Sequence, residues 1–235
     1  MKHLFFLIFA CGCFAQNDVN KLNSAGNKDG LWRGFFEESK RIRFEGTFKN
    51  GVEEGVFSFF DDTKSHDVVA TRAFSENGTV AVNKFFDQKK YLVSEGKTLN
   101  RKNEGAWRYY HRESKDLKMT EFYRNGVLQG PQKNYYLGNI LASEITFADG
   151  KKNGSQKIYA ANGTLIEESN FKNNQYDGFC IFRNAMGQIV LQGKFVDGIK
   201  KGAWQFFENG KLIKTEKFPK QKKFAKKNDI IKSNK

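Results

Sequence analysis

The 235-residue sequence predicts an all-β fold, an elongated antiparallel β-meander (repeat solenoid) of about eight β-hairpin units. Three observations lead to this prediction: a unit of 24–26 residues that recurs along the chain, apolar residues that alternate at period two, and Asn-Gly or Asp-Gly pairs between the apolar runs. Alternation at period two places successive side chains on opposite faces of a strand. Asn-Gly and Asp-Gly are the pairs that two-residue hairpin turns favour. Each unit is therefore expected to be two antiparallel strands, sixteen in all, and no stretch after residue 16 carries the apolar stripe of a helix.

A glycine before each aromatic run marks the start of a unit. These anchors are Gly30, Gly55, Gly105, Gly130, Gly154, Gly178 and Gly202, with Ala81 in the place of the missing one. Successive anchors lie 25, 26, 24, 25, 24, 24 and 24 residues apart. A fixed period of this length is the signature of stacked units that touch only their neighbours. The unit from Ala81 to Glu104 departs most from the pattern, and we expect a bulge or bend in the sheet there.

Aromatic residues recur at fixed places in the units, and a single sheet has no second layer to cover them. We therefore expect the rings to pack along the sheet on rings of adjacent units. The recurring Gly46, Gly96 and Gly193 are expected to let a large ring of the next unit lie over the backbone. The tryptophans Trp32, Trp107 and Trp204 are the candidate binding surface, because an aromatic strip left on an exposed face of the sheet would bind a partner.

Residues 1–15 have the layout of a secretory signal peptide. Lys2 gives a basic start, residues 4–10 are an unbroken apolar run, and Cys13-Phe14-Ala15 fits the small-x-small pattern of a cleavage site. We expect cleavage between Ala15 and Gln16. The apolar run is far shorter than the ~20 residues that span a bilayer, so no transmembrane segment is expected in the mature chain. The predicted location is the periplasm, the cell envelope or the medium.

The cysteines leave a second reading of this segment open. Ala10 and Gly12 are the small residues that a lipid-anchored Cys11 or Cys13 would need in front of it, so lipoprotein anchoring is the alternative to plain export. After cleavage the mature chain holds Cys180 alone, and one thiol cannot form an internal disulfide. Cys180 lies in an apolar run and is expected to be a small buried residue.

Residues with the patterns of catalytic or metal sites are scarce. His66 and His111 both lie in polar stretches where the turn of a unit is lengthened. The stretch around His66 lacks the Gly and terminal Glu of a calcium loop. Phosphate loops, zinc spacings and nucleophile elbows do not occur. We therefore expect no enzyme, no metal and no cofactor.

The excess positive charge is concentrated at the C-terminus. The chain has a formal net charge of +14 from 40 Lys and Arg against 26 Asp and Glu. Lys220, Lys222, Lys223, Lys226 and Lys227 are the candidate anion-binding residues of a basic tail that is predicted to be disordered. A tail that only improves solubility is the competing interpretation. Nucleic acid is not an expected partner of an exported protein.

The units resemble a known repeat. Residues 202–212 (GAWQFFENGKL), residues 105–110 (GAWRYY) and residues 153–163 (NGSQKIYAANG) are similar to the bacterial variant of the MORN (membrane occupation and recognition nexus) repeat. The resemblance covers roughly residues 30–218. It implies hairpins stacked into an elongated sheet, and scaffolding or binding in place of catalysis. Some members are named YwqK-type antitoxins, and eukaryotic members are linked to membrane lipids and complex assembly.

Four segments and three functions follow from these features. The segments are a signal peptide (1–15), an N-terminal lead-in (16–29), the repeat array (30–218) and the basic tail (219–235). The leading hypothesis is an exported, non-enzymatic repeat protein that binds another macromolecule, with a protein as the expected partner, along its sheet. The alternatives are an antitoxin-like immunity protein that masks a toxin, and an envelope-associated protein that binds anionic lipid or polysaccharide.

Overall fold

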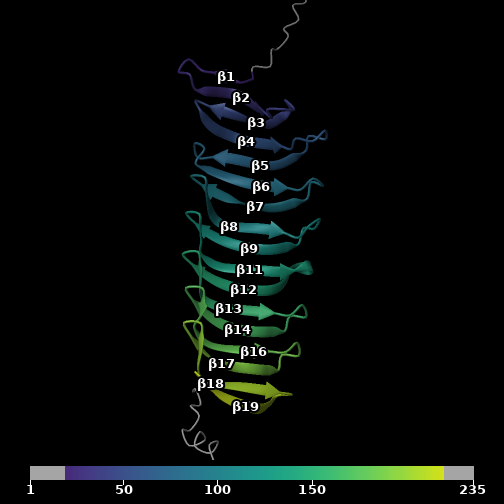
Figure 1. The fold of residues 1–235 in the computed structure, drawn as a ribbon. Helices are drawn as coiled ribbons and strands as arrows, with labels where there is room; N and C mark the ends of the chain where they lie inside the picture. Colours follow the sequence, from purple (N-terminus) through teal and green to yellow (C-terminus); the bar gives the residue numbers. More distant parts are fainter. Residues whose placement is uncertain (1–18, 220–235) are drawn as a thin grey trace, which may run out of the picture.

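Residues 19–219 are described by a computed structural model, and they form one elongated stack of strands (Figure 1). The predicted signal peptide, with Ala15 and Gln16, and Lys220 to Lys227 of the predicted tail lie outside the described residues. The all-β prediction is confirmed, because the stack is a single 19-stranded antiparallel sheet. One 3₁₀ turn, η1 (Leu137–Asn139), is the only helical segment between residues 19 and 219.

The strands follow one another in chain order. Their bounds are β1 (Lys21–Leu22), β2 (Lys28–Phe35), β3 (Ile42–Lys49), β4 (Val52–Phe60), β5 (Val68–Ser75), β6 (Val80–Phe86), β7 (Leu92–Leu99), β8 (Lys102–Tyr110), β9 (Leu117–Arg124), β10 (Val127–Leu128), β11 (Gly130–Tyr136), β12 (Ile140–Ala148), β13 (Lys151–Tyr159), β14 (Leu165–Lys172), β15 (Gln175–Tyr176), β16 (Gly178–Arg183), β17 (Ile189–Val196), β18 (Ile199–Glu208) and β19 (Lys211–Phe218). The pairings are those of a meander, with each hairpin bonded to the hairpins before and after it.

Nineteen strands replace the predicted sixteen for two local reasons. The short β1 precedes the array and pairs with β2, inside the segment predicted as a lead-in. In two units the first strand is divided, at Gln129 between β10 and β11 and at Asp177 between β15 and β16. The N–H of Gln129 donates to the carbonyl of Phe122 at 2.7 Å and that of Asp177 to the carbonyl of Asn170 at 2.8 Å, so both halves stay bonded to the preceding strand. The underlying plan is eight hairpins.

Four anchor glycines, Gly55, Gly105, Gly154 and Gly202, stand at bulges, and this corrects the expectation for the irregular unit. Gly55 and Gly105 have φ of +68°, a conformation that costs glycine little and other residues much. The register shifts beside them, between β3 and β4 and between β7 and β8. Ala81 cannot adopt this conformation cheaply, and β5 pairs with β6 without any shift. The unit predicted to be bulged or bent is therefore the unit that lacks the bulge.

Turns on one side of the sheet are tied to the preceding unit by backbone hydrogen bonds. The N–H of Gly51 donates to the carbonyl of Lys28 at 2.7 Å, and the N–H of Gly126 to that of Asn103 at 2.9 Å. The same bond recurs at Gly150, Asn174 and Gly198. These turns form the left margin of the stack in Figure 1. A second line of bonds beside the strand pairings thus joins one unit to the next.

The two ends of the sheet differ. At the first end β1 covers β2, and Asn20 adds a bond from its Nδ2 to the carbonyl of Arg33 at 3.0 Å. At the other end β19 pairs with β18, and within residues 19–219 no strand pairs with its second edge. Among residues 19–219, a strand covers the array at its N-terminal end and none covers it at its C-terminal end.

Candidate interaction surfaces

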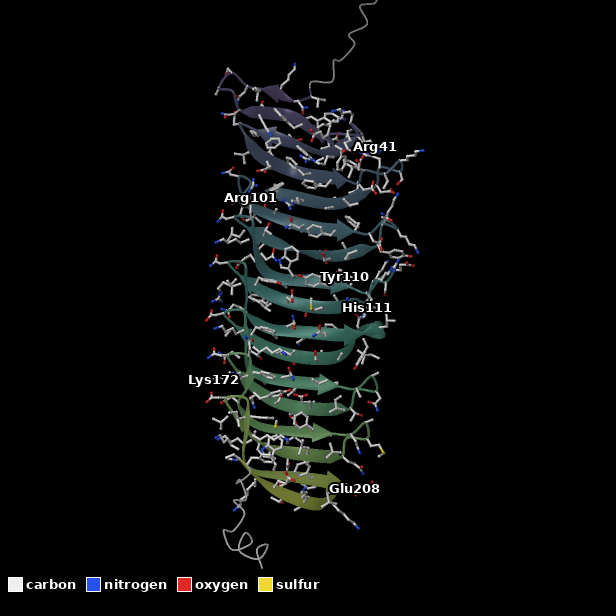
Figure 2. The ribbon with its side chains drawn as sticks, viewed as in Figure 1. Arg41, Arg101, Tyr110, His111, Lys172 and Glu208 are labelled. Carbon is white, nitrogen blue, oxygen red and sulfur yellow. The ribbon has the colours of Figure 1, made fainter. Side chains whose placement is uncertain are left out.

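The two faces of the sheet have different roles. Buried residues line one of them, which we call the ring face after Phe57, Trp107 and Trp204. Their neighbours in sequence point to the opposite side. That side, the open face, carries Val56, which is 60% exposed, and Phe122, which is 41% exposed. The core and the more exposed surface are thus the two sides of the same strands, and Figure 2 shows side chains along the whole length of the stack.

Large rings on the ring face lie over glycines of the preceding unit, as the sequence predicts. A Cβ on Gly96 would lie 2.2 Å from Cδ2 of Trp107, and a Cβ on Gly193 would lie 2.4 Å from Cδ2 of Trp204. Gly46 stands in the same relation to Phe57. The indole Nε1 of Trp107 donates to the carbonyl of Lys97 at 3.0 Å. Close approach of the ring and a satisfied indole N–H together fix each tryptophan in the core.

This packing corrects the prediction of a tryptophan binding surface. Trp204 is 0% exposed and Trp107 is 6% exposed, so neither ring is available to a partner. Trp32 is half-buried, and its Nε1 donates to the carbonyl of Lys21 in β1 at 3.1 Å. The glycine contact that the sequence predicts is made by these same indoles, so the contact itself buries Trp107 and Trp204.

Polar side chains replace the rings in the middle of the ring face. Gln132 and Gln156 stand at the place that Trp107 and Trp204 occupy in their units, two residues after the anchor. Nε2 of Gln132 donates to Oε1 of Glu121 at 2.7 Å. Nε2 of Gln156, which is 5% exposed, donates to Oε1 of Glu167 at 2.8 Å. We call this region, from β9 to β16, the polar seam.

Glu167 is the centre of the seam. Its Oε1 also accepts bonds from Oγ of Ser169 at 2.7 Å and from the hydroxyl of Tyr176 at 3.0 Å. Burial, followed by the nearby carboxylate, raises the pKa of Tyr176 to about 12. Burial also raises the pKa of Cys180 to about 11, which leaves the thiol protonated and unreactive at neutral pH. These bonds satisfy the side chains of Gln156, Ser169 and Tyr176, and they indicate a structural role.

A missing ring produces a cleft at the irregular unit. Asn83 takes the ring position and is 2% exposed, with Nδ2 donating to the carbonyls of Ala81 and Gly96 at 3.2 Å each. A cleft of about 200 Å³ opens beside it, and Arg72 and Arg101 are among its lining residues. Arg101 is paired with Glu53 at 2.9 Å. The cleft follows from the substitution of an amide for an aromatic ring.

The two histidines lie in turns at the other margin and bond to backbone. Nε2 of His66 lies 2.7 Å from the carbonyl of Ile42, and Nε2 of His111 lies 2.9 Å from the carbonyl of Tyr135. Each ring thus joins two successive units. Nowhere in residues 19–219 do three His, Cys, Asp or Glu side chains group closely enough to hold a metal ion.

Apolar and small side chains form a row along the N-terminal half of the open face, interrupted on β7 by the exposed Lys97, which the register places opposite Val82. The register places Val56 opposite Ala73, Ala73 opposite Val82, and Ala106 opposite Phe122. Val82 is 45% exposed. The open-face row consists of Val56, Ala73, Val82, Ala106 and Phe122. Such a row, left in solvent, is the kind of patch that marks an interaction site.

Charged side chains of alternating sign run beside this row. Nε of Arg33 and Oε2 of Glu45 are 2.6 Å apart, and Nζ of Lys133 and Oε1 of Glu144 are 3.4 Å apart. Between them the register places Lys84 opposite Glu95. The ion pairs lie on β2–β3 and β11–β12, beyond the two ends of the row, and Lys84 and Glu95 lie beside it, which resembles the polar rim beside the apolar core of a protein interface.

One unit matches a family model. Residues 152–173 match the family described as "MORN repeat variant", and this range is the hairpin of β13 and β14. The chain carries a MORN-variant repeat. Seven further hairpins repeat the strand pairing of this MORN-variant unit. The YwqK-type specificity stays a prediction.

Other comparisons are sparse. No curated protein matches this chain. A solved structure of a point mutant of S. aureus TarM, in complex with fondaparinux, alpha-GlcNAc-glycerol and UDP, is similar, with 13% identity and a TM-score of 0.23, over 52% of this chain and 19% of that chain. A second TarM crystal structure gives 16% identity and a TM-score of 0.22, over 52% and 20%. The chain thus spans about a fifth of the length of these TarM chains. Between residues 19 and 219 no helix has the length and apolar character to cross a membrane.

Proposed function

We propose that this is an exported, non-enzymatic repeat protein that binds another protein along the open face of its sheet. MORN repeats are generally associated with binding to membranes or proteins. The observation that supports the proposal is the open-face row, in which Val56 and Val82 remain 60% and 45% exposed. A monomer gains no stability from apolar side chains in solvent, whereas a partner that covers them would gain from their burial.

Two variants of matched chemistry test this proposal. Phe122→Ser removes a ring of the open-face row, while Phe179→Ser removes a ring that is 53% exposed on the same face but lies outside the row. We expect affinity capture from the native cell envelope to recover one partner with the native protein and with Phe179→Ser. Phe122→Ser should lose it, with unchanged circular dichroism. If all three proteins recover the partner equally, the open-face row is not its binding site.

Export is a separate part of the proposal. It rests on the apolar run and the small-x-small site before Gln16, which lie outside the described residues. N-terminal sequencing of the protein from outside the cytoplasm should begin at Gln16. Recovery of a form that begins at Met1, and only in the cytoplasm, would instead favour the antitoxin-like alternative. A lipid-modified N-terminus at Cys11 or Cys13 would favour the envelope-anchored alternative.

A further inference from the structure

The open edge of β19 has the backbone geometry of an internal junction. In β9 and β14 the residue before the last aromatic, Phe122 or Asn170, presents its carbonyl to the next unit and accepts the N–H of Gln129 or Asp177. Lys217 holds the same place in β19. Residues two apart on a strand present their N–H and C=O groups to the same edge, so Thr215 and Lys217 both aim these groups away from β18. The edge is a template for one more strand.

An apolar side chain on β19 lacks the cover that its equivalents have. The residue six places before the last aromatic of each unit, or before Thr98 in the irregular unit, is aliphatic throughout. Seven of these residues are half-buried: Ile42, Val68, Leu92, Leu117, Leu141, Leu165 and Ile189. The eighth, Leu212, is 52% exposed, and Ile213 beside it is 61% exposed. A strand added to β19 would cover Leu212 as each following unit covers the equivalents.

The positive charge of β19 determines which strand can pair with its edge. Lys211, Lys214 and Lys217 are exposed on β19, and Lys214 is ion-paired with Glu216. Two copies joined through β19 would place these lysines near one another, and like charges across a strand pair are destabilising. Head-to-tail stacking of copies is obstructed because β1 covers the first edge. Residues 220–235 carry seven Lys and one Asp, so this segment has the wrong sign as well.

We propose that an extended acidic segment of a separate polypeptide adds to β19 as a further antiparallel strand. The polar seam specifies one of its residues. Glu121 occupies in β9 the place of Glu216 in β19, and it accepts a bond from Gln132 of the next unit at 2.7 Å. The added strand therefore carries an amide side chain opposite Glu216, acidic residues near the lysines and an aliphatic residue over Leu212. Main-chain bonds give such a complex its affinity, and these side chains give it its specificity.

A capped ten-residue peptide in which Glu alternates with Val and Thr around a central Gln is the probe, and the same peptide with Lys for Glu is its control. We expect the full mature protein to bind the acidic peptide and not the basic one in isothermal titration.

Thr215→Pro removes the outward N–H without touching the bonds to β18, and it should weaken binding of the acidic peptide at least tenfold. Thr215→Val keeps that N–H and should bind like the native protein. The triple variant Lys211→Glu/Lys214→Glu/Lys217→Glu should prefer the basic peptide.

A variant ending at Pro219 separates the edge from the basic tail, and its circular dichroism checks that it is folded. Retained binding supports the edge. Binding lost on truncation would place the peptide on the tail, and binding that survives Thr215→Pro would place it elsewhere on the sheet. A native dimer that Thr215→Pro dissociates would make a second copy the occupant. Each of these three results overturns the proposal. Phe122→Ser should leave peptide binding unchanged, so this site and the open-face row can fail independently.

Discussion

At the scale of single residues, the core obeys one pairing rule at the junctions between units. A large ring two places after the anchor always meets a glycine of the preceding unit, as at Gly46–Phe57, Gly96–Trp107 and Gly193–Trp204. Where that position of the preceding unit holds a side chain, the next unit has a smaller or flexible residue: Arg72–Asn83, Glu121–Gln132, Ile145–Gln156 and Ser169–Cys180. Space on one strand is therefore matched to volume on the next.

Gly96→Ala tests this rule directly. The new Cβ would clash with the indole of Trp107, and overpacking of this kind costs about 1–3 kcal/mol of unfolding free energy. The double variant Gly96→Ser/Trp107→Cys installs the pair found at Ser169–Cys180, and should be less destabilised than the sum of its two single variants. Urea unfolding of the native protein, Gly96→Ser, Trp107→Cys and the double variant measures the coupling, and Gly96→Ala is unfolded in the same way. Strict additivity would show that the ring and the glycine are independent.

The raised pKa of Tyr176 makes a second prediction at this scale. Its folded value, about 12, lies above the ordinary value of 10.0, so the folded state keeps the phenol protonated longer than the unfolded state does. This contribution to stability is complete below pH 10 and is lost as the pH rises toward 12. Tyr176→Phe should therefore flatten the loss of stability over pH 10–12.

The control for this titration is Tyr91→Phe, on a side chain that is 40% exposed. Denaturant unfolding at several pH values from 8 to 12 compares the two variants with the native protein. If the free energy of unfolding of Tyr176→Phe falls with pH as steeply as that of the native protein, the bond between Tyr176 and Glu167 has no thermodynamic role.

At the scale of elements, the sequence predicts the hairpins well because the signals are local. Asn-Gly and Asp-Gly turns and the alternation of apolar residues lie within one unit, and eight hairpins are found where they are expected. The ring that each glycine admits depends on the register between units, which is why Trp107 and Trp204 were wrongly predicted to be exposed although the glycine contact itself was predicted. The polar seam was missed, although Gln132, Gln156 and Cys180 become visible when the ring position is compared from unit to unit.

Deletions of whole units compare the signals within a unit, which each deletion leaves intact in the remaining units, with the contacts between units, which it changes. Removal of residues 154–177 takes out one unit and brings Cys180 against Ile145, a pair without a large ring. Removal of residues 81–104 is equally long, but it brings Trp107 against Arg72 in place of Gly96. We expect the first variant to stay folded with a modestly lower melting temperature, and the second to be much less stable.

A shorter deletion supplies the control for these two variants. Removal of residues 154–165 leaves a strand without its hairpin partner and breaks the register, so it should unfold more of the protein than either whole-unit deletion. Melting curves followed by circular dichroism measure the order. Equal damage from the three deletions would contradict nearest-neighbour stacking.

At the scale of the whole molecule, the basic tail predicted from the sequence can be tested apart from the described array. Each Lys of the tail near an anionic membrane contributes ~1 kcal/mol, and salt screens this attraction. We expect the mature protein to bind anionic vesicles at low salt and to release them as salt is raised. A variant ending at Pro219 should lose most of this binding and remain β-rich. Vesicle binding that persists after truncation would place the lipid site on the sheet.

The strand-to-strand bonds of this sheet lie along the long axis of the stack, and the two ends of the described chain lie at opposite ends of that axis (Figure 1). A force that pulls the ends apart therefore acts along the hydrogen bonds between strands, so that the strand pairs separate one after another. Each hairpin of 24 residues released in this way would lengthen the chain by about 70 Å, after its folded height is subtracted from its extended length. The hairpin that contains β19 should unfold first, and the hairpin that β1 covers should unfold last. Stretching of single molecules should accordingly show a regular series of small steps, so the protein would act as an extensible tether.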